Sequence, residues 1–306
     1  MPTIRELPRQ LMRYALVFLF VSQIGIAEVT AQQHSDPRWI TTWATSPSTL
    51  PPTNEDYAEI EDQTLRLVIH SSIGGESARL RLANYHGDQP VHIGAVTIAL
   101  QTEGSSIQSA SLQSVSFGGT ESISIPRGAV VLSDPVSFIV PQLSNLVVSV
   151  YLPESSGFLT AHALSNQTNY ISSSGDHTAA TNLPIEGESA AWNLLTAIDV
   201  IHNEQVSAIA TVGDSITDGW GSTLSGNQRW PNHFARRLFA DNSIDNFAVV
   251  NAGISGNQVT TEGNSLFGQN LQARFERDVL ALSKVTHMVL MEGINDIGMS
   301  SSGDAQ

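Results

Sequence analysis

The chain has 306 residues, 41% of them hydrophobic and 14% charged, and this length can bury two domain cores. Its formal net charge of −15 excludes a basic footprint for nucleic acid, and its only lysine, Lys284, does not stand in a phosphate-binding Gly-Lys-Ser/Thr loop. Cysteine is absent, which excludes disulfides, thiolate nucleophiles and cysteine-bound metals.

The first thirty-one residues have the pattern of a secretory signal peptide. Three arginines precede an apolar run from Tyr14 to Ala27, and Val29-Thr30-Ala31 supplies small residues for signal peptidase. The fourteen residues of this run would span about 21 Å as a helix, less than a hydrocarbon core of about 30 Å. We therefore expect cleavage after Ala31, a secreted or periplasmic protein, and no stable membrane span after cleavage. An uncleaved membrane anchor is the alternative.

Between Trp39 and Ile201 the hydrophobic pattern has a period of two. Leu65, Leu67 and Ile69 stand at every second position, as in a half-buried strand. Further β-branched runs, bounded by turn residues, lie at 91–100, 122–126, 136–140, 145–152 and 192–201. The Ser-, Gly- and Thr-rich segment 172–189 predicts a long surface loop. Together these patterns predict an antiparallel sandwich or barrel, and the fold that we expect over residues 36–203 is a jelly-roll-like β-sandwich domain.

A different pattern begins at about Glu204. The apolar runs SAIATVG (207–213), FAVVNAG (247–253) and HMVLMEG (287–293) are predicted strands. Segments with a helical period, 230–239 and 266–282, lie between them. Alternating strands and helices indicate right-handed crossovers and a parallel sheet, so residues 206–306 are predicted to form an α/β domain.

Small polar residues follow each of these three strands. The segments are GDSITDG (213–219), NAGISGN (251–257) and GIND (293–296), and ligands bind outside the carboxyl ends of such strands. Ser215 can act as a nucleophile, while a Gly256 N–H and an Asn295 amide can stabilise an oxyanion. Each residue alone is typical of a turn or a helix cap. Their order and their spacings of 41 and 39 residues indicate one catalytic site.

These three segments resemble the first three sequence blocks of the GDSL/SGNH hydrolase superfamily. The resemblance implies that Ser215 is the nucleophile and that Gly256 and Asn295 belong to the oxyanion hole. It also implies a three-layer, flavodoxin-like catalytic domain that hydrolyses carboxylic esters without a metal or other cofactor. The segments WITTWATSP (39–47) and GDHTA (175–179) are similar to the β-rich domain that precedes the GDSL domain in some secreted bacterial esterases.

The family's fourth block, an Asp-x-x-His that supplies the general base and its orienting carboxylate, has no counterpart after Asn295. We therefore expect a C-terminally truncated reading with an incomplete α/β domain, or a degenerate chain, and little ester hydrolysis by these 306 residues alone. Asp199-Val200-Ile201-His202 has the spacing but precedes the nucleophile, and it is predicted to be a strand end. His233 and His287 are predicted to lie in a helix and at the far end of a strand.

The function that these patterns favour is an exported serine esterase acting on a small-molecule or polysaccharide ester. Acetylated sugars and short acyl esters are the expected substrates, by analogy at the level of the fold. Two alternatives stay open: a catalytically dead carbohydrate-binding remnant, and an acyltransferase that passes the acyl group to a sugar hydroxyl. The five tryptophans could stack on sugars, although core packing is their commoner use.

Overall fold

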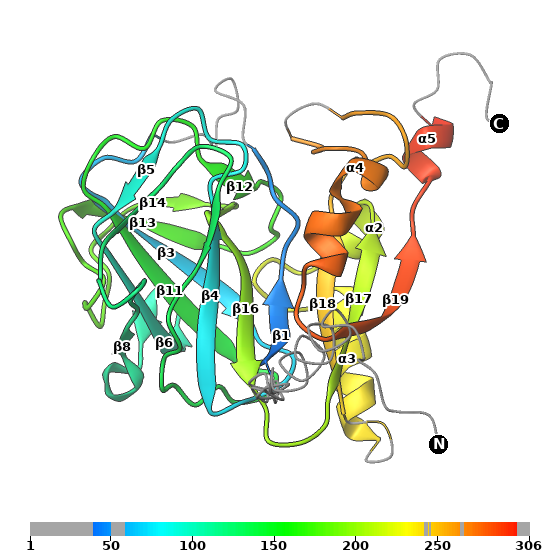
Figure 1. Ribbon diagram of the computed structural model, residues 1–306, viewed down its shortest axis with the longest axis horizontal. Coiled ribbons are helices and arrows are strands. Elements are labelled where there is room, and N and C mark those ends of the chain that lie inside the picture. Colours follow the sequence, from blue (N-terminus) through cyan, green and yellow to red (C-terminus); the bar gives the residue numbers. More distant parts are fainter. Residues whose placement is uncertain (1–38, 50–58, 242–243, 245, 264–265, 299–306) are drawn as a thin grey trace, which may run out of the picture. The chain divides into compact units, whose positions relative to one another are not determined.

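Hydrophobic alternation builds two antiparallel sheets in the computed structural model, which describes residues 39–49, 59–241, 244, 246–263 and 266–298 (Figure 1). The predicted signal peptide, residues 1–31, lies outside the described residues. The first sheet has the strand order β1 (Trp39–Ala44), β16 (Leu195–Ile201), β4 (Ser77–Ala83) and β10 (Val130–Leu132). The second has the order β14 (Ile185–Ser189), β13 (Asn169–Ser174), β3 (Gln63–His70), β11 (Asn145–Leu152), β6 (Ala95–Glu103) and β7 (Ser106–Ile107), with β8 (Gln113–Ser114) paired to β6.

Shorter elements complete this β-rich region. They are β15 (Trp192–Asn193), β12 (Thr160–His162), β2 (Ser48–Thr49), β5 (Val91–Ile93), β9 (Ile123–Ile125) and the 3-10 helix η1 (Ser109–Ser111). One hydrophobic core takes side chains from both large sheets, such as Leu80 and Ile198 from the first and Leu67 and Val148 from the second. Burying each such side chain contributes roughly 1.5–3 kcal/mol. The predicted β-rich N-terminal region is therefore confirmed, while its jelly-roll character stays a prediction.

Two local predictions in this region are wrong. Segment 172–189 is not a continuous loop, because β13 and β14 form an antiparallel hairpin that joins the edge of β3. Its polar residues suit this place, since the outermost strand, β14, is mostly exposed. Segment 136–140 alternates between buried and exposed side chains as expected, but it forms only isolated bridges, at Val136 and Val140.

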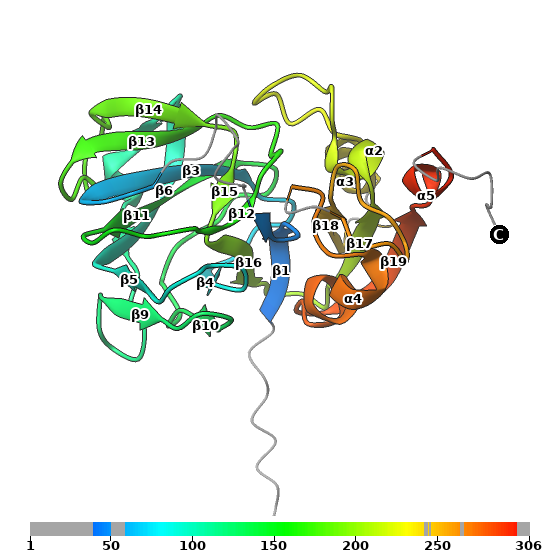
Figure 2. The same ribbon diagram turned by 90° about the horizontal axis from the view of Figure 1, so that it is seen from above.

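The parallel sheet has the order β18 (Phe247–Gly253), β17 (Ser207–Gly213) and β19 (Val285–Met291). In its register Gly213 pairs with Gly253 on one side and with Met291 on the other, so the three strands end at the same level. Strand β18, which follows α3, and strand β19, which follows α4, lie on opposite sides of β17. Helix α3 (Trp230–Ala240) packs on one face of the sheet and α4 (Leu271–Phe275) on the other (Figure 2).

The described helices are few and short. Besides α3 and α4 they are α2 (Ser215–Asp218), the π-helix η2 (Glu276–Leu280) and α5 (Ile294–Gly298). The helix predicted at 266–282 begins only at Leu271, where Asn270 caps it by accepting a hydrogen bond from the N–H of Ala273 (2.9 Å). None of the described helices is long and apolar enough to cross a membrane.

Direct hydrogen bonds join the β-rich region to the parallel-sheet region. Thr41 of β1 donates its N–H to the Ser283 carbonyl (3.2 Å), and its hydroxyl accepts the N–H of Ser283 (2.9 Å). Arg81 of β4 donates to the Ala281 carbonyl (2.8 Å). The two regions thus belong to one compact unit that begins at Arg38. The domain limits 36–203 and 206–306 stay predictions.

Candidate active site

Ser215 is the first residue of α2 and follows the central strand of the parallel sheet. Asp214 caps this helix by accepting a hydrogen bond from the N–H of Ile216 (3.0 Å), and the helix ends at Gly219, whose φ is 103°. Ser215 is half-buried, and neither its hydroxyl nor its N–H bonds to another described residue. It therefore presents a hydroxyl and an N–H donor at the carboxyl edge of the sheet.

Gly256 and Asn295 lie in the loops that follow the outer strands. Gly256 has a φ of 78°, and a Cβ there would overlap the ring of Phe267, so both backbone and packing require glycine. Asn295 donates one amide N–H to the Asn257 carbonyl (2.9 Å), and its own carbonyl accepts a hydrogen bond from Gln258 (2.9 Å). A side-chain amide has two N–H donors. One N–H of Asn295 holds the side chain in place, and the other is available to donate to an oxyanion.

The structure joins the loops of Gly256 and Asn295 directly and joins Ser215 to them through neighbours. Asp218, three residues after Ser215, accepts hydrogen bonds from the N–H (2.9 Å) and the hydroxyl (2.6 Å) of Ser255. Ser215 itself has no hydrogen bond to Gly256 or Asn295. The three predicted residues thus share one edge of the sheet, held by a framework beneath them.

Arg274, a residue that the sequence analysis missed, holds this framework together. Its side chain is fully buried and donates to the Gly213 carbonyl (3.3 Å), the Ala252 carbonyl (2.8 Å), Asn257 Oδ1 (2.9 Å) and Ser46 Oγ (3.0 Å). Burial lowers the pKa of Arg274, which the Asp278 and Glu292 carboxylates oppose from 3.4 and 3.9 Å. Arg274 and Asp278 lie on the same helical face as buried Leu271. Two charged residues on the apolar face of a predicted helix could have indicated a buried ion pair from the sequence.

Glu292, at the end of β19, is a second buried charge near the three loops. Its side chain is 1% exposed, and neither carboxylate oxygen accepts a hydrogen bond from the described residues. Burial raises the pKa of Glu292 to about 7; Arg274 opposes this rise, and Asp214 and Asp296 add to it. This carboxyl group is therefore poised to take up a proton close to neutral pH.

The histidines considered as bases are placed elsewhere. Asp199 is a structural residue, as predicted, because it accepts from Thr41 (2.8 Å), Arg79 (2.9 Å) and Ser283 (2.8 Å). His202 follows the end of β16, His233 is exposed on α3, and His287 packs on the Phe247 ring at 5.3 Å. No imidazole in the described part of the chain is hydrogen-bonded to Ser215.

The described residues contain no group of three His, Asp or Glu side chains arranged to hold a metal ion. The residues at this edge of the sheet supply a serine hydroxyl and the N–H groups of Ser215, Gly256 and Asn295. Such an arrangement can carry out nucleophilic acyl transfer.

The family comparison agrees with this class for the C-terminal segment. Residues 211–306 match the model of the GDSL-like Lipase/Acylhydrolase family, which confirms the predicted resemblance of this segment to GDSL/SGNH hydrolases. Among solved structures, the chain is similar to a family two carbohydrate esterase from Cellvibrio japonicus, with 12% identity and a TM-score of 0.27 over 87% of this chain and 68% of that one. A family two carbohydrate esterase from Clostridium thermocellum, in complex with cellohexaose, shows 11% identity and a TM-score of 0.27 over 86% and 67%. The comparison with curated proteins gave no match.

Proposed function

We propose that this protein is an exported serine esterase that hydrolyses carboxylic esters through an acyl-serine intermediate on Ser215. The observation that carries the proposal is the free Ser215 hydroxyl after the central strand, within the GDSL-like segment. Export is inferred from the signal-peptide pattern of residues 1–31. In the same proposal the β-rich region is jelly-roll-like, and the parallel sheet is part of a three-layer, flavodoxin-like domain.

In the proposed mechanism, Ser215 Oγ attacks the ester carbonyl carbon. Its proton passes to a histidine base, which the family resemblance places in an Asp-x-x-His block, and then to the departing alcohol as the C–O bond breaks. A water molecule activated by the same base then hydrolyses the acyl-serine and releases the acid. The oxyanion receives hydrogen bonds from the Ser215 and Gly256 N–H groups and the second amide N–H of Asn295, each contributing about 10²–10³ in kcat.

The proposed substrates are acylated sugars or other short acyl esters. Close to Ser215 in sequence, the chain exposes two large apolar side chains, Ile216 and Trp220, and Trp220 is 68% exposed. An indole ring can stack on the face of a sugar ring, and exposed apolar side chains of this size are typical of binding surfaces. Trp39, Trp43 and Trp192, by contrast, are buried and serve the core.

A fluorophosphonate probe tests the nucleophile in a chain that also carries the Asp-x-x-His block. We expect the probe to label wild type and Ser137→Ala, whose exposed serine lies in the β-rich region, but not Ser215→Ala. Turnover of p-nitrophenyl acetate should fall by about 10⁶-fold in Ser215→Ala. Equal labelling of wild type and Ser215→Ala would rule out the assignment.

A further inference from the structure

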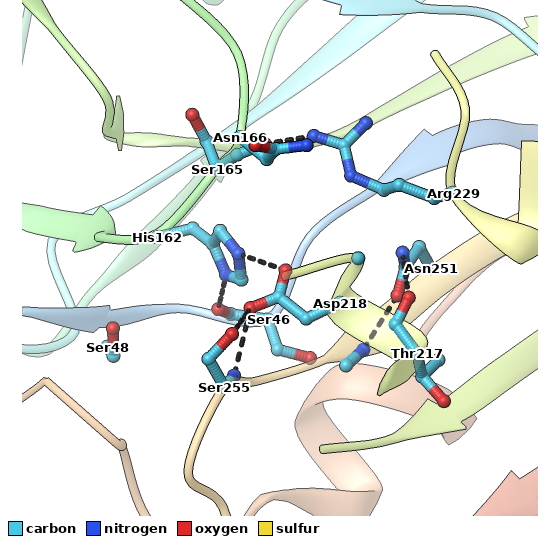
Figure 3. A network of polar contacts seen from close by, with 12 residues as sticks. Ser46, Ser48, His162, Ser165, Asn166, Thr217, Asp218, Arg229, Asn251 and Ser255 are labelled. Atoms are coloured by element: carbon cyan, nitrogen blue, oxygen red, sulfur yellow. Dashed lines mark hydrogen bonds and ion pairs between the residues drawn. The ribbon is translucent and has the colours of Figure 1, made fainter. Parts of the chain in front are cut away.

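A buried ion pair crosses from the β-rich region to the catalytic loops. His162, at the end of β12, lies 2.9 Å from Asp218 in α2, and both side chains are only 3% exposed (Figure 3). Asp218 belongs to the same short helix as Ser215, and through it His162 faces the loop that carries Gly256. This pair joins the β-rich region directly to the helix that begins with the proposed nucleophile.

The hydrogen bonds of His162 define its protonation state. Its Nδ1 lies 2.8 Å from the Ser46 carbonyl, which can only accept, so Nδ1 carries a proton. Its Nε2 faces Asp218 Oδ1, while Asp218 Oδ2 accepts both hydrogen bonds from Ser255. An ionised Asp218 that accepts at both oxygens leaves Nε2 protonated as well. His162 is then an imidazolium with no lone pair to offer and cannot be the general base for Ser215.

The surrounding charges agree with this ion pair. Burial works against the charged imidazole, but the Asp218 carboxylate and the hydrogen bonds outweigh it, so the pKa of His162 is raised. Burial likewise opposes ionisation of Asp218, yet His162, Ser255 and Arg229 together lower the pKa of Asp218. Arg229 is the other charged group that faces the pair; it donates to the Ser165 carbonyl and lies 5.3 Å from the Trp192 ring.

We propose that His162 is a positioning residue for the esterase site, fixing Asp218 and, through it, the Ser255–Gly256 backbone that presents an oxyanion N–H. The proposal rests on the proposed function in assigning Gly256 to the oxyanion hole. It makes the β-rich region part of the catalytic apparatus, because the imidazolium comes from β12 and its second acceptor, Ser46, follows β1.

The chain of contacts explains why Gly256 depends on His162. Without the imidazolium, Asp218 would be a buried carboxylate without this partner, and its free energy would favour protonation or movement towards water. A protonated or displaced Asp218 can no longer accept both the N–H and the hydroxyl of Ser255. The ψ angle of Ser255, which aims the N–H of Gly256, would then be free to change.

The test compares His162→Ala, His162→Gln and Ser255→Ala in a chain that also carries the Asp-x-x-His block, with exposed His233→Gln as the matched control. Two quantities are measured: kcat and KM on p-nitrophenyl acetate, and amide hydrogen exchange in residues 254–257. We expect His162→Ala to lower kcat by about 10²-fold, with KM within about threefold of wild type, and to speed exchange in this segment. Glutamine keeps a donor towards Asp218, so His162→Gln should restore most of kcat.

The outcomes separate the two proposals. Wild-type kcat and wild-type exchange in both His162→Ala and Ser255→Ala, with only a lower melting temperature in His162→Ala, would overturn the positioning role. If His162→Ala does not fold, Ser255→Ala still tests the link between Asp218 and Gly256 and should also lower kcat and speed exchange. Absence of ester turnover in wild type would overturn the proposed esterase function, whereas faster exchange at 254–257 in the variants would still support the link from His162 to Gly256.

Discussion

Arg66 and Arg274 are both fully buried, the first in β3 of the β-rich region and the second in α4 beside the parallel sheet. Arg66 bonds only within its own region, to Ser149 Oγ and to the carbonyls of Ser105, His177 and Ala180. Arg274 reaches both regions, because its partners include Ser46 as well as the ends of β17 and β18. The two side chains have the same chemistry but organise different parts of the molecule.

The difference lies in the partners. Among the described residues Arg66 has no carboxylate partner, and burial lowers the pKa of Arg66 to about 10. Three carbonyl groups and the Ser149 hydroxyl compensate its charge. Arg274 is compensated by Asp278 and Glu292, and its remaining donors go to the strand ends from which the catalytic loops leave. A buried arginine in the β-rich region thus stabilises neighbouring loops, whereas Arg274 ties the fold to the proposed site.

Arg274→Met should show the largest effect. It leaves buried Glu292 without its cation and Asp278 with Arg277 alone, which costs about 3–5 kcal/mol of unfolding free energy, and it releases the loop of Asn257. We expect urea unfolding to report this loss and kcat of the folded fraction to fall by about 10²-fold.

Arg66→Met is the matched control. It leaves buried acceptors without their donor but leaves no carboxylate unpaired. The expected loss of unfolding free energy is therefore about 1–3 kcal/mol, with an unchanged kcat. Equal losses of kcat in both variants would remove the distinction between the two arginines.

Asn295→Ala tests the proposed oxyanion hole, which lies on the Arg274 side of the comparison between the two arginines. Loss of one oxyanion donor should lower kcat by about 10²–10³-fold, while the bond to the Asn257 carbonyl contributes only about 1 kcal/mol to stability. Asn182→Ala is the control, since it removes an exposed amide that accepts from Ser106 in the β-rich region (2.8 Å). A loss of melting temperature large enough to account for the lost activity would make Asn295 structural.

Glu292→Gln should change the pH dependence of stability. Because the pKa of Glu292 is raised to about 7 in the folded state, the neutral carboxyl stabilises the fold fully below its unfolded pKa of about 4.3. That contribution is lost as the pH rises from about 4.3 through about 7. Urea midpoints at pH 5 and pH 8 should therefore differ more in wild type than in Glu292→Gln, with exposed Glu204→Gln behaving as wild type. Parallel pH profiles for wild type and Glu292→Gln would contradict this expectation.

Trp220→Ala should have the smallest effect. The indole is mostly exposed, so unfolding free energy should stay within about 0.5 kcal/mol of wild type. If Trp220 contacts the substrate, KM for an acylated sugar should rise by about tenfold, with a smaller change for p-nitrophenyl acetate. Identical changes for the two substrates would argue against sugar stacking.

The sequence predicted those parts of the molecule that local pattern encodes. The bounds of β17 and β18 agree with the predicted runs 207–213 and 247–253, because apolar residues bounded by glycine leave little freedom in assigning them. The start of α2 at Ser215 follows from Asp214, a good N-cap residue. The hairpin of β13 and β14 was missed because an edge strand can be polar and then resembles a loop.

The framework beneath the site could not be read from the sequence in the same way. His162 and Asp218 are 56 positions apart, and Ser46 and Arg274 are 228 apart, so no local period relates them. His162 has no neighbouring motif, and its role follows only from the packing of β12 against the loops of the parallel sheet. The motif residues were predictable because their chemistry repeats at strand ends, whereas their supports depend on tertiary contacts.

The hydrogen bonds between Thr41 and Ser283 also bear on how the protein is made. These residues are 242 positions apart, so β1 emerges from the ribosome long before its last partner. Contacts of such separation slow folding, because the entropy of closing a long chain segment is lost before the contact is gained. Strand β1 and the segment up to Ser46 therefore stay incompletely hydrogen-bonded until Arg274 and Ser283 are in place. The buried support of the candidate active site is then among the last parts of the molecule to form.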